Sequence, residues 1–218
     1  MKVCVYAICK NESQFVDRFM DSMSEADYVC VLDTGSSDDT VKKLRARGAI
    51  VGETVVSPWR FDTARNESLG LIPADADICC AIDLDEQFHP GWRAALERAW
   101  QPDTTRARYR YTWSFRPDGS EGMVFWADKI HKNGCYRWAS PVHETLAYTG
   151  EGAERFVDAA GVQLDHHPDE TKSRGQYLPL LELAVREDPH NDRNMHYLGR
   201  EYLFAGNWQA CADTLRRH

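Results

Sequence analysis

The first half of the chain alternates short β-prone runs with segments of helical character, and this alternation limits the fold more than any other feature. The β-prone runs span residues 3–9, 28–32, 49–56 and 77–82. The helix-like segments between them span residues 15–23, 41–47 and 61–71. Strands and helices that alternate at this pace form a mostly parallel sheet with helices packed on its faces. The sequence therefore predicts an α/β fold.

The second half of the chain changes character twice. Residues 106–115 and 122–130 predict two further strands, joined by a turn at 117–119 as an antiparallel addition to the sheet. Residues 138–149 have an irregular pattern, and a last strand is expected at 160–164. Three helices are predicted after Pro168, at residues 172–187, 192–205 and 208–217. We therefore expect a sheet domain over residues 1–170 and a helical extension over residues 171–218.

Composition and missing motifs exclude several classes of protein. The formal net charge of −8 disfavours duplex DNA as the main partner, because DNA-binding proteins carry a basic surface. Seven cysteines without a Cys-x-x-Cys spacing predict free thiols and a cytoplasmic location. The apolar start at residues 1–8 is too short to span a bilayer, so we expect no transmembrane segment. The motifs of dinucleotide oxidoreductases, common NTPases and α/β-hydrolases do not occur.

Polar clusters follow three of the predicted strands at the points where these strands end. The clusters are Lys10-Asn11-Glu12, residues 33–40 and residues 83–86. The carboxyl ends of parallel strands meet at one edge of a sheet, and ligands of such sheets bind outside that edge. We therefore expect the three clusters to lie together in space.

Asp83 and Asp85 follow the buried strand expected at residues 77–82. Two carboxylates at a strand end can reach one cation or its water shell, and Mg²⁺ prefers oxygen ligands together with water and substrate phosphates. Such an ion stabilises negative charge on a departing diphosphate. An isolated Asp-x-Asp pair is more often a solvated loop or a helix cap, and the position after an apolar strand favours the metal hypothesis.

Two further residues have a functional and a structural interpretation. Asp33 can accept hydrogen bonds from a nucleotide base or ribose, or it can stabilise a turn in which Gly35 has a positive φ. Arg65 can pair with a phosphate, or it can be a surface arginine paired with Asp62 on the same helix.

The pair His143-Glu144 lies in the irregular region. A zinc-protease motif needs a second histidine four residues after the first, and that position holds Ala147. Glu144 can instead act as a general base, and His143 and Trp138 are candidates for orienting or binding an acceptor. An ordinary polar loop is the alternative.

Two adjacent histidines, His166 and His167, follow the last predicted strand. A histidine here can add a nitrogen ligand to a metal ion held by Asp85. The alternative is a buried, hydrogen-bonded histidine with a structural role.

The order of these motifs resembles the family-2 glycosyltransferases of the GT-A fold. The resemblance is carried by five segments that cover essentially the whole chain: residues 8–12, 31–40, 61–67, 82–86 and 142–144. It is nearest to the bacterial and phage branch that carries tetratricopeptide repeats. The resemblance implies a transferase that moves a sugar from a nucleoside-diphosphate sugar to a hydroxyl acceptor.

The resemblance also implies roles for the residues that bind the donor. Asp33 would face the base and Arg65 the base or diphosphate, and Lys10, Asn11 and Glu12 would also bind the donor nucleotide. Asp83 and Asp85 would form the donor and metal motif for Mn²⁺ or Mg²⁺, with Asp85 the more direct ligand. UDP is the nucleotide expected by resemblance.

The remaining implied roles concern catalysis and the metal. Glu144 would be the base that deprotonates the acceptor in an inverting, in-line displacement. A histidine follows the last strand of the sheet in this branch. His166 matches that place best as a metal ligand, and His167 is the fallback.

The C-terminal helices resemble tetratricopeptide repeats. Leu198-Gly199 and Tyr202 fit the repeat pattern, and Pro189 lies where the preceding repeat should end. About one and a half repeats are present, and such units need neighbours to cover their faces. They are expected to pack on the sheet domain, on a second copy of the chain in a homo-oligomer, or on residues of a longer parent protein.

Two alternative functions and the acceptor stay open. The alternatives are a non-catalytic scaffold with a decayed transferase domain and a sugar nucleotidyltransferase. The acceptor can be a glycan, a peptide or, in phage, a modified nucleic acid. Arg106, Arg108 and Arg110 alternate with Tyr109 and Tyr111, which suits nucleic acid, but a solvated sheet face is the favoured interpretation.

Overall fold

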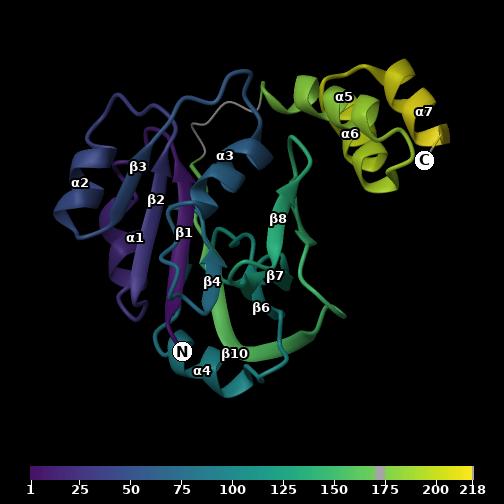
Figure 1. Ribbon diagram of the computed structural model, residues 1–218. Coiled ribbons are helices and arrows are strands. Elements are labelled where there is room, and N and C mark those ends of the chain that lie inside the picture. The colour runs from purple at the N-terminus through teal and green to yellow at the C-terminus, as the bar shows by residue number, and fades with distance from the viewer. Residues whose placement is uncertain (170–174, 218) are drawn as a thin grey trace.

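The computed structural model describes residues 1–169 and 175–217 (Figure 1). One sheet holds eight strands in the order β3-β2-β1-β4-β7-β6-β10-β5. Their bounds are β1 Val3–Cys9, β2 Tyr28–Asp33, β3 Ile50–Glu53, β4 Ile78–Ala81, β5 Glu86–Phe88, β6 Arg106–Thr112, β7 Val124–Lys132 and β10 Phe156–His166. The helices of the sheet domain are α1 Val16–Ser22, α2 Thr40–Ala46, α3 Phe61–Leu69 and α4 Trp92–Ala99.

The sheet has a parallel half and a mixed half. Strands β3, β2, β1 and β4 are parallel to one another, and β6 is parallel to β10. Strand β7 is antiparallel to both β4 and β6, and β5 is antiparallel to β10. The predicted α/β class with a mostly parallel sheet is confirmed, and the topology is consistent with the GT-A fold.

Alternate residues of β1 supply the two faces of the sheet. Val3, Val5 and Ala7 belong to a core with side chains of α1, α2 and α4. Cys4 and Tyr6 point to the other face, in a second core beneath α3. Both faces are covered, which explains why β1 is a continuous apolar run.

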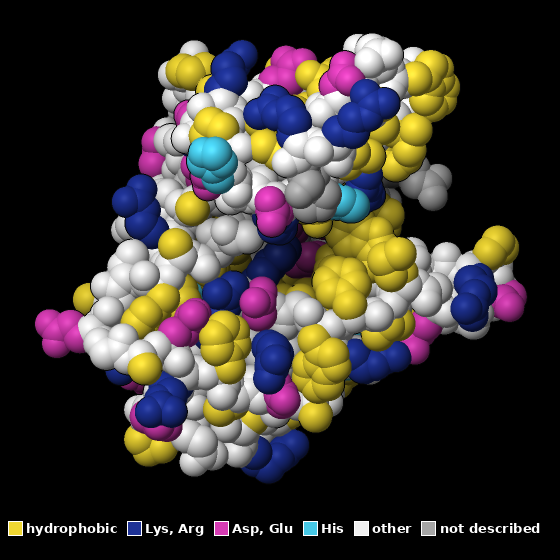
Figure 2. Space-filling model, turned by 90° about the vertical axis from the view of Figure 1, so that its right-hand side faces the viewer, with side chains coloured by type: hydrophobic (Ala, Val, Ile, Leu, Met, Phe, Trp, Pro, Cys, Tyr) yellow, Lys and Arg dark blue, Asp and Glu magenta, His cyan; other side chains and the backbone are white. Residues whose placement is uncertain are grey.

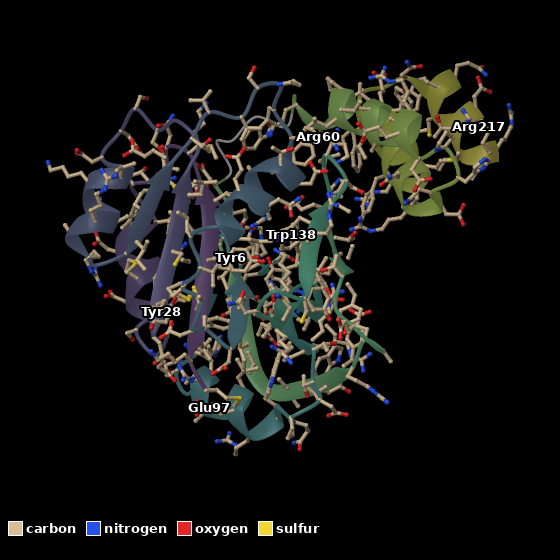
Figure 3. The ribbon with its side chains drawn as sticks, viewed as in Figure 1. Tyr6, Tyr28, Arg60, Glu97, Trp138 and Arg217 are labelled. Atoms are coloured by element: carbon tan, nitrogen blue, oxygen red, sulfur yellow. The ribbon has the colours of Figure 1, made fainter. Side chains whose placement is uncertain are left out.

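The region at 138–149, which was expected to be irregular, contains two short strands. Strands β8 (Tyr136–Ala139) and β9 (Thr145–Tyr148) pair antiparallel, with Trp138 opposite Leu146. Their buried residues pack under α3, and Figure 3 shows Tyr6 and Trp138 beside each other there. The sequence pattern did not reveal this pairing, because both strands are short and a proline lies between them. Strand β5 and helix α4 also had no prediction.

Three helices follow the sheet domain: α5 Tyr177–Glu187, α6 Asp192–Phe204 and α7 Trp208–Arg217. The expected helix start at 172 and the expected boundary between 170 and 171 fall outside the described residues. In Figure 1 the three helices gather beyond α3 and the upper end of β8. No helix among the described residues is long and apolar enough to cross a membrane.

Helices α5 and α6 pack on the sheet domain. Leu181 of α5 and Leu198 of α6 share a core with Val142, and Arg60 at the junction pairs with Glu187 (Figure 3). Gly199 lies against Leu215 of α7, where a Cβ atom would overlap with the leucine side chain. Of the three expected partners for these helices, the sheet domain is therefore one that they pack on. The assignment as tetratricopeptide repeats and the homo-oligomer stay predictions.

Candidate active site

The carboxyl edge of the parallel strands gathers side chains that are far apart in sequence. Asp33 ends β2, Asp83 and Asp85 follow β4, and His166 ends β10, which β7 and β6 separate from β4 in the sheet. Glu144 reaches the same place from the loop between β8 and β9. Figure 2 shows a hollow on this side of the molecule, with acidic and basic side chains at its floor.

Arg65 links two of the predicted site residues. Its Nη2 donates to both carboxylate oxygens of Asp83, at 2.8 and 3.1 Å, and its Nε donates to Oε1 of Glu144 at 2.6 Å. The guanidinium lies over the Trp138 ring, 5.1 Å from the ring centroid. Arg65 is buried, and Asp62 pairs with Arg60 instead, so the surface interpretation of Arg65 is wrong.

One nitrogen of Arg65 has no protein partner. Its Nη1 is buried and makes no hydrogen bond within the part of the chain that the structure describes. A buried guanidinium donor is costly to leave unpaired, because it has lost its bonds to bulk water. The arrangement suits an oxygen of a ligand or an ordered water at this position.

Lys129 and Glu86 surround Asp83, and neither had a predicted role. Lys129 Nζ lies 3.6 Å from Asp83 and 3.4 Å from Glu86. Burial acts to raise the pKa of Asp83, but the charges of Arg65 and Lys129 outweigh it and hold this pKa below its ordinary value. Glu86 accepts from the Asp83 amide at 2.8 Å and from the Tyr111 hydroxyl at 2.6 Å, and burial raises its pKa. The carboxylate of Asp83 is therefore held as an anion among cations.

Asp85 faces His166. The two side chains approach to 3.5 Å between Oδ2 and Nε2, while His166 Nδ1 lies 3.0 Å from the Trp113 carbonyl oxygen. That carbonyl places a proton on Nδ1, so the neutral ring presents the Nε2 lone pair to Asp85. Burial acts to lower the pKa of His166, but the Asp85 carboxylate outweighs it and the net shift is upward. A cation, whether proton or metal, suits the space between them.

His167 lies apart from this pair. Its ring stacks on Phe115 with the ring centroids 5.3 Å apart, and its backbone amide donates to the Asp85 carbonyl oxygen at 2.8 Å. The first choice, His166, is therefore the histidine whose side chain faces Asp85.

The metal-binding side chains at this site suit an ion that also binds a ligand better than an ion held by protein ligands alone. Among the described residues no group of three or more His, Cys, Asp or Glu side chains is arranged to hold a metal. Asp85 and His166 converge, whereas Asp83 is engaged by Arg65. Mg²⁺ and Mn²⁺ take oxygen ligands, and Mg²⁺ sites commonly keep waters and phosphate oxygens. Two protein ligands are consistent with such a site.

Asp33 stabilises the loop that follows β2. Its Oδ1 accepts from the amides of Gly35 at 3.0 Å and Ser36 at 2.8 Å, and the Ser36 hydroxyl donates to Oδ2. Gly35 has a φ of 105°, as the turn interpretation requires. The carboxylate therefore has a structural role, and contact with a nucleotide stays a prediction.

The cluster after β1 ties the same loops together. The amide of Ser37 donates to Asn11 Oδ1 at 2.7 Å, and the Glu12 amide donates to Thr40 Oγ1 at 2.8 Å. Lys10 is exposed beside them. The structure brings this cluster to the Asp33 loop, and its role in donor binding stays a prediction.

Helix α6 holds the loop that carries Glu144. The backbone carbonyl oxygen of His143 accepts from Arg193, and the His143 ring stacks on Tyr197 with the centroids 4.1 Å apart. Val142 is buried against α5 and α6. The His143 ring is thus placed against the helical extension.

Trp138 is buried and packs against the guanidinium of Arg65. It is 2% exposed, its Nε1 donates to the Tyr6 hydroxyl at 3.0 Å, and Asn66 bonds its backbone at both N and O. This position lies beneath Arg65, where the ring cannot present its face to an acceptor. Asn66, which had no predicted role, fixes α3 to β8.

The arginines of β6 are each paired with carboxylates. Arg106 bonds Asp128 and Glu154, Arg108 bonds Asp158, and Arg110 bonds Glu121. A sheet face prepared for nucleic acid would present these charges to phosphates. The exposed Arg108 fits the solvated sheet face that the sequence favoured, whereas Arg106 is buried and does not.

No protein-family model matches the chain. Solved structures of glucosyl-3-phosphoglycerate synthase from Mycobacterium tuberculosis match half of it, at 26% identity and a TM-score of 0.42. They include complexes with Mn²⁺, UDP and glucosyl-3-phosphoglycerate, with Mn²⁺ and UDP-glucose, and with Mn²⁺, UDP-glucose and glycerol 3-phosphate. The matched region covers 43–44% of the synthase chain, so this chain aligns with less than half of that enzyme's length.

Proposed function

We propose that the chain is a metal-dependent glycosyltransferase that moves a sugar from a nucleoside-diphosphate sugar to a hydroxyl acceptor. The observation that carries the proposal is the link through Arg65, which places Glu144 beside Asp83 at the carboxyl edge of the sheet. A base and an acidic donor motif that share one guanidinium form a compact centre for transfer.

Glu144 is the base in this proposal. It accepts the proton of the acceptor hydroxyl while the acceptor oxygen forms a bond to the anomeric carbon of the donor. The bond from that carbon to the diphosphate breaks, and the nucleoside diphosphate leaves with the electron pair. A displacement from the opposite face inverts the configuration, which is the stereochemistry we expect.

Asp85 and His166 are the residues that would hold Mn²⁺ or Mg²⁺. When bound, the ion neutralises charge on the departing diphosphate. Asp83 would orient the donor through Arg65, and the buried Nη1 of Arg65 supplies a further donor toward a ligand oxygen. Arg65 and Lys129 are paired with Asp83, Glu144 and Glu86, so the ion would supply the net positive charge near the leaving group.

Thermal unfolding with nucleotides tests the proposal. UDP is the first probe, with and without Mn²⁺, against the wild type, Asp85→Ala and Asp103→Ala as a matched exposed control. A ligand at a hundred times its dissociation constant stabilises the native state by about 2.7 kcal/mol. We expect stabilisation by UDP only with Mn²⁺, lost in Asp85→Ala and kept in the control. Equal stabilisation of Asp85→Ala would contradict the assignment.

A further inference from the structure

Exposed aromatic rings lie on one face of the β6–β7 ribbon. Tyr111 pairs with Phe125 in the register of these strands, and Trp113 follows two residues after Tyr111 on the same face. Trp113 is 44% exposed and Phe125 is 42% exposed, whereas Tyr111 is buried beneath them. Figure 2 shows hydrophobic side chains at the rim of the central hollow. Contiguous exposed apolar surface often marks a binding site, whereas scattered exposed apolar residues do not.

This aromatic face is continuous with the candidate site. The Trp113 ring stacks on the His166 ring with the centroids 4.5 Å apart and an interplanar angle of 28°. His166 in turn faces Asp85 at 3.5 Å. Phe125 packs edge-on against Tyr111, whose hydroxyl donates to Glu86. The free surface of Trp113 is therefore one ring away from the pair that would hold the metal.

Two basic side chains on the strands that carry these rings are paired with carboxylates, which weakens their attraction for an anionic ligand. Arg110 is neutralised by Glu121, and Lys129 by Asp83 and Glu86. A phosphorylated acid or an anionic membrane would compete with these carboxylates, and the chain carries a net charge of −8. A neutral ring that has an apolar C–H face and a polar edge matches stacked aromatic surfaces with few free charges.

We propose that Trp113 and Phe125 form the acceptor subsite, and that the acceptor presents a neutral pyranose ring to them. This inference rests on the proposed function and adds the chemical class of the acceptor to it. The free face of Trp113 is the face turned away from His166, so a ring stacked there lies beside the Asp85–His166 pair with the indole between them.

The opposite face of the same strand supplies a matched control. Trp126 lies opposite Arg110, so its side chain points to the other side of the ribbon from Phe125. It is 53% exposed and equally aromatic. Replacement of Trp126 therefore removes a similar amount of surface without touching the proposed subsite.

Saturation-transfer NMR on the full chain tests the subsite without nucleotide. The probes are the methyl α- and β-pyranosides of glucose, galactose, mannose and N-acetylglucosamine. We expect at least one to bind through its C–H face, with an affinity weakened about fivefold or more by Trp113→Ala and by Phe125→Ala. Trp126→Ala should bind as the wild type does, and Trp113→Phe should recover part of the affinity that Trp113→Ala loses, because a smaller aromatic ring still stacks.

Three outcomes would overturn the inference. They are the absence of pyranoside binding to the wild type, an equal loss in Trp126→Ala, and binding of 3-phosphoglycerate or of phosphatidylcholine vesicles at Trp113 in place of sugars. The nucleotide experiment keeps the two proposals distinguishable. If UDP stabilises the protein and no pyranoside binds, the subsite fails alone; if pyranosides bind at Trp113 and UDP does not, the transferase proposal fails and Trp113 is a sugar-binding surface without an acceptor role.

Discussion

Arg65 and Glu144 are joined by a hydrogen bond of 2.6 Å between Nε and Oε1, although they are 79 residues apart in sequence. The same guanidinium holds Asp83 through Nη2. A planar guanidinium has donors on two edges, so one arginine can fix two carboxylates in a defined relation. The relation between the proposed base and the acidic motif is therefore set by a single side chain.

Arg65→Ala should destabilise the fold as well as remove activity. It leaves Asp83 and Glu144 without their shared cation, and removal of one partner of a buried ion pair costs about 3–5 kcal/mol. Urea unfolding measures this loss. Arg65→Lys should recover part of the stability, because an ammonium can neutralise the carboxylates without fixing both. A loss below about 1 kcal/mol in Arg65→Ala would place the pair among weak surface ion pairs.

Glu144→Gln should bind nucleotide normally and lose sugar transfer. The amide keeps the size of the side chain and can no longer accept the acceptor proton, and removal of a general base lowers turnover by about 10²–10⁴-fold. Turnover and nucleotide-dependent stabilisation are measured on the same preparation. Glu151→Gln, an exposed change in the loop after β9, is the control. Full activity of Glu144→Gln would mean that another group takes the proton.

Arg193→Ala should impair turnover without weakening nucleotide binding. Arg193 donates to the His143 carbonyl oxygen, and Tyr197 supports the His143 ring, so α6 fixes the residue next to Glu144. We expect a lower kcat, an unchanged KM for the donor, and partial recovery in Arg193→Lys. Proportional losses in kcat and in folded protein would show that Arg193 only stabilises the fold.

His131 should make stability depend on pH. It is buried between the Tyr6 hydroxyl, 2.8 Å from Nε2, and the Lys132 carbonyl oxygen, 3.0 Å from Nδ1. Burial lowers its pKa to about 4. The unfolded chain takes up a proton near pH 6.5 and the folded chain does not, so stability is full above about pH 6.5 and falls as the pH drops toward 4.

The size of this loss follows from the same pKa difference. It amounts to about 3 kcal/mol across the window, at 1.36 kcal/mol for each pH unit. Urea unfolding between pH 7 and pH 4 measures it, and His131→Asn should flatten that part of the profile relative to the wild type. An identical profile in His131→Asn would assign the dependence to other groups.

The sequence predicted the parallel half of the fold well because its physical signals are local. Apolar runs such as Val3–Cys9 are buried on both faces, and each ends in a polar loop at the edge where ligands bind. The strands β8 and β9 escaped prediction, since four-residue strands separated by Pro141 carry almost no periodicity.

Three residues proposed for the site lie together in the structure, and their roles stay predictions, whereas the bonds between them were not predicted. Asp83, Glu144 and Arg65 were each proposed, but Arg65 was assigned to the nucleotide and not to the two carboxylates. The hydrogen bonds from Arg65 to Asp83 and Glu144 join residues on separate elements. A single sequence carries no signal for such bonds. Lys129 was missed for the same reason, because a lysine in a strand near 122–130 is ordinary until the fold brings it to Asp83.

Binding of Mn²⁺ followed by electron paramagnetic resonance tests the central claim most directly. Free Mn²⁺ is titrated with the protein, with and without UDP, using the wild type, Asp85→Ala and His166→Ala. Because Asp85 and His166 supply only two ligands, we predict weak binding alone, much tighter binding with UDP, and loss of the UDP-dependent part in both variants. Mn²⁺ binding that ignores UDP, or that survives both substitutions, would contradict a metal-dependent transfer site at this edge of the sheet.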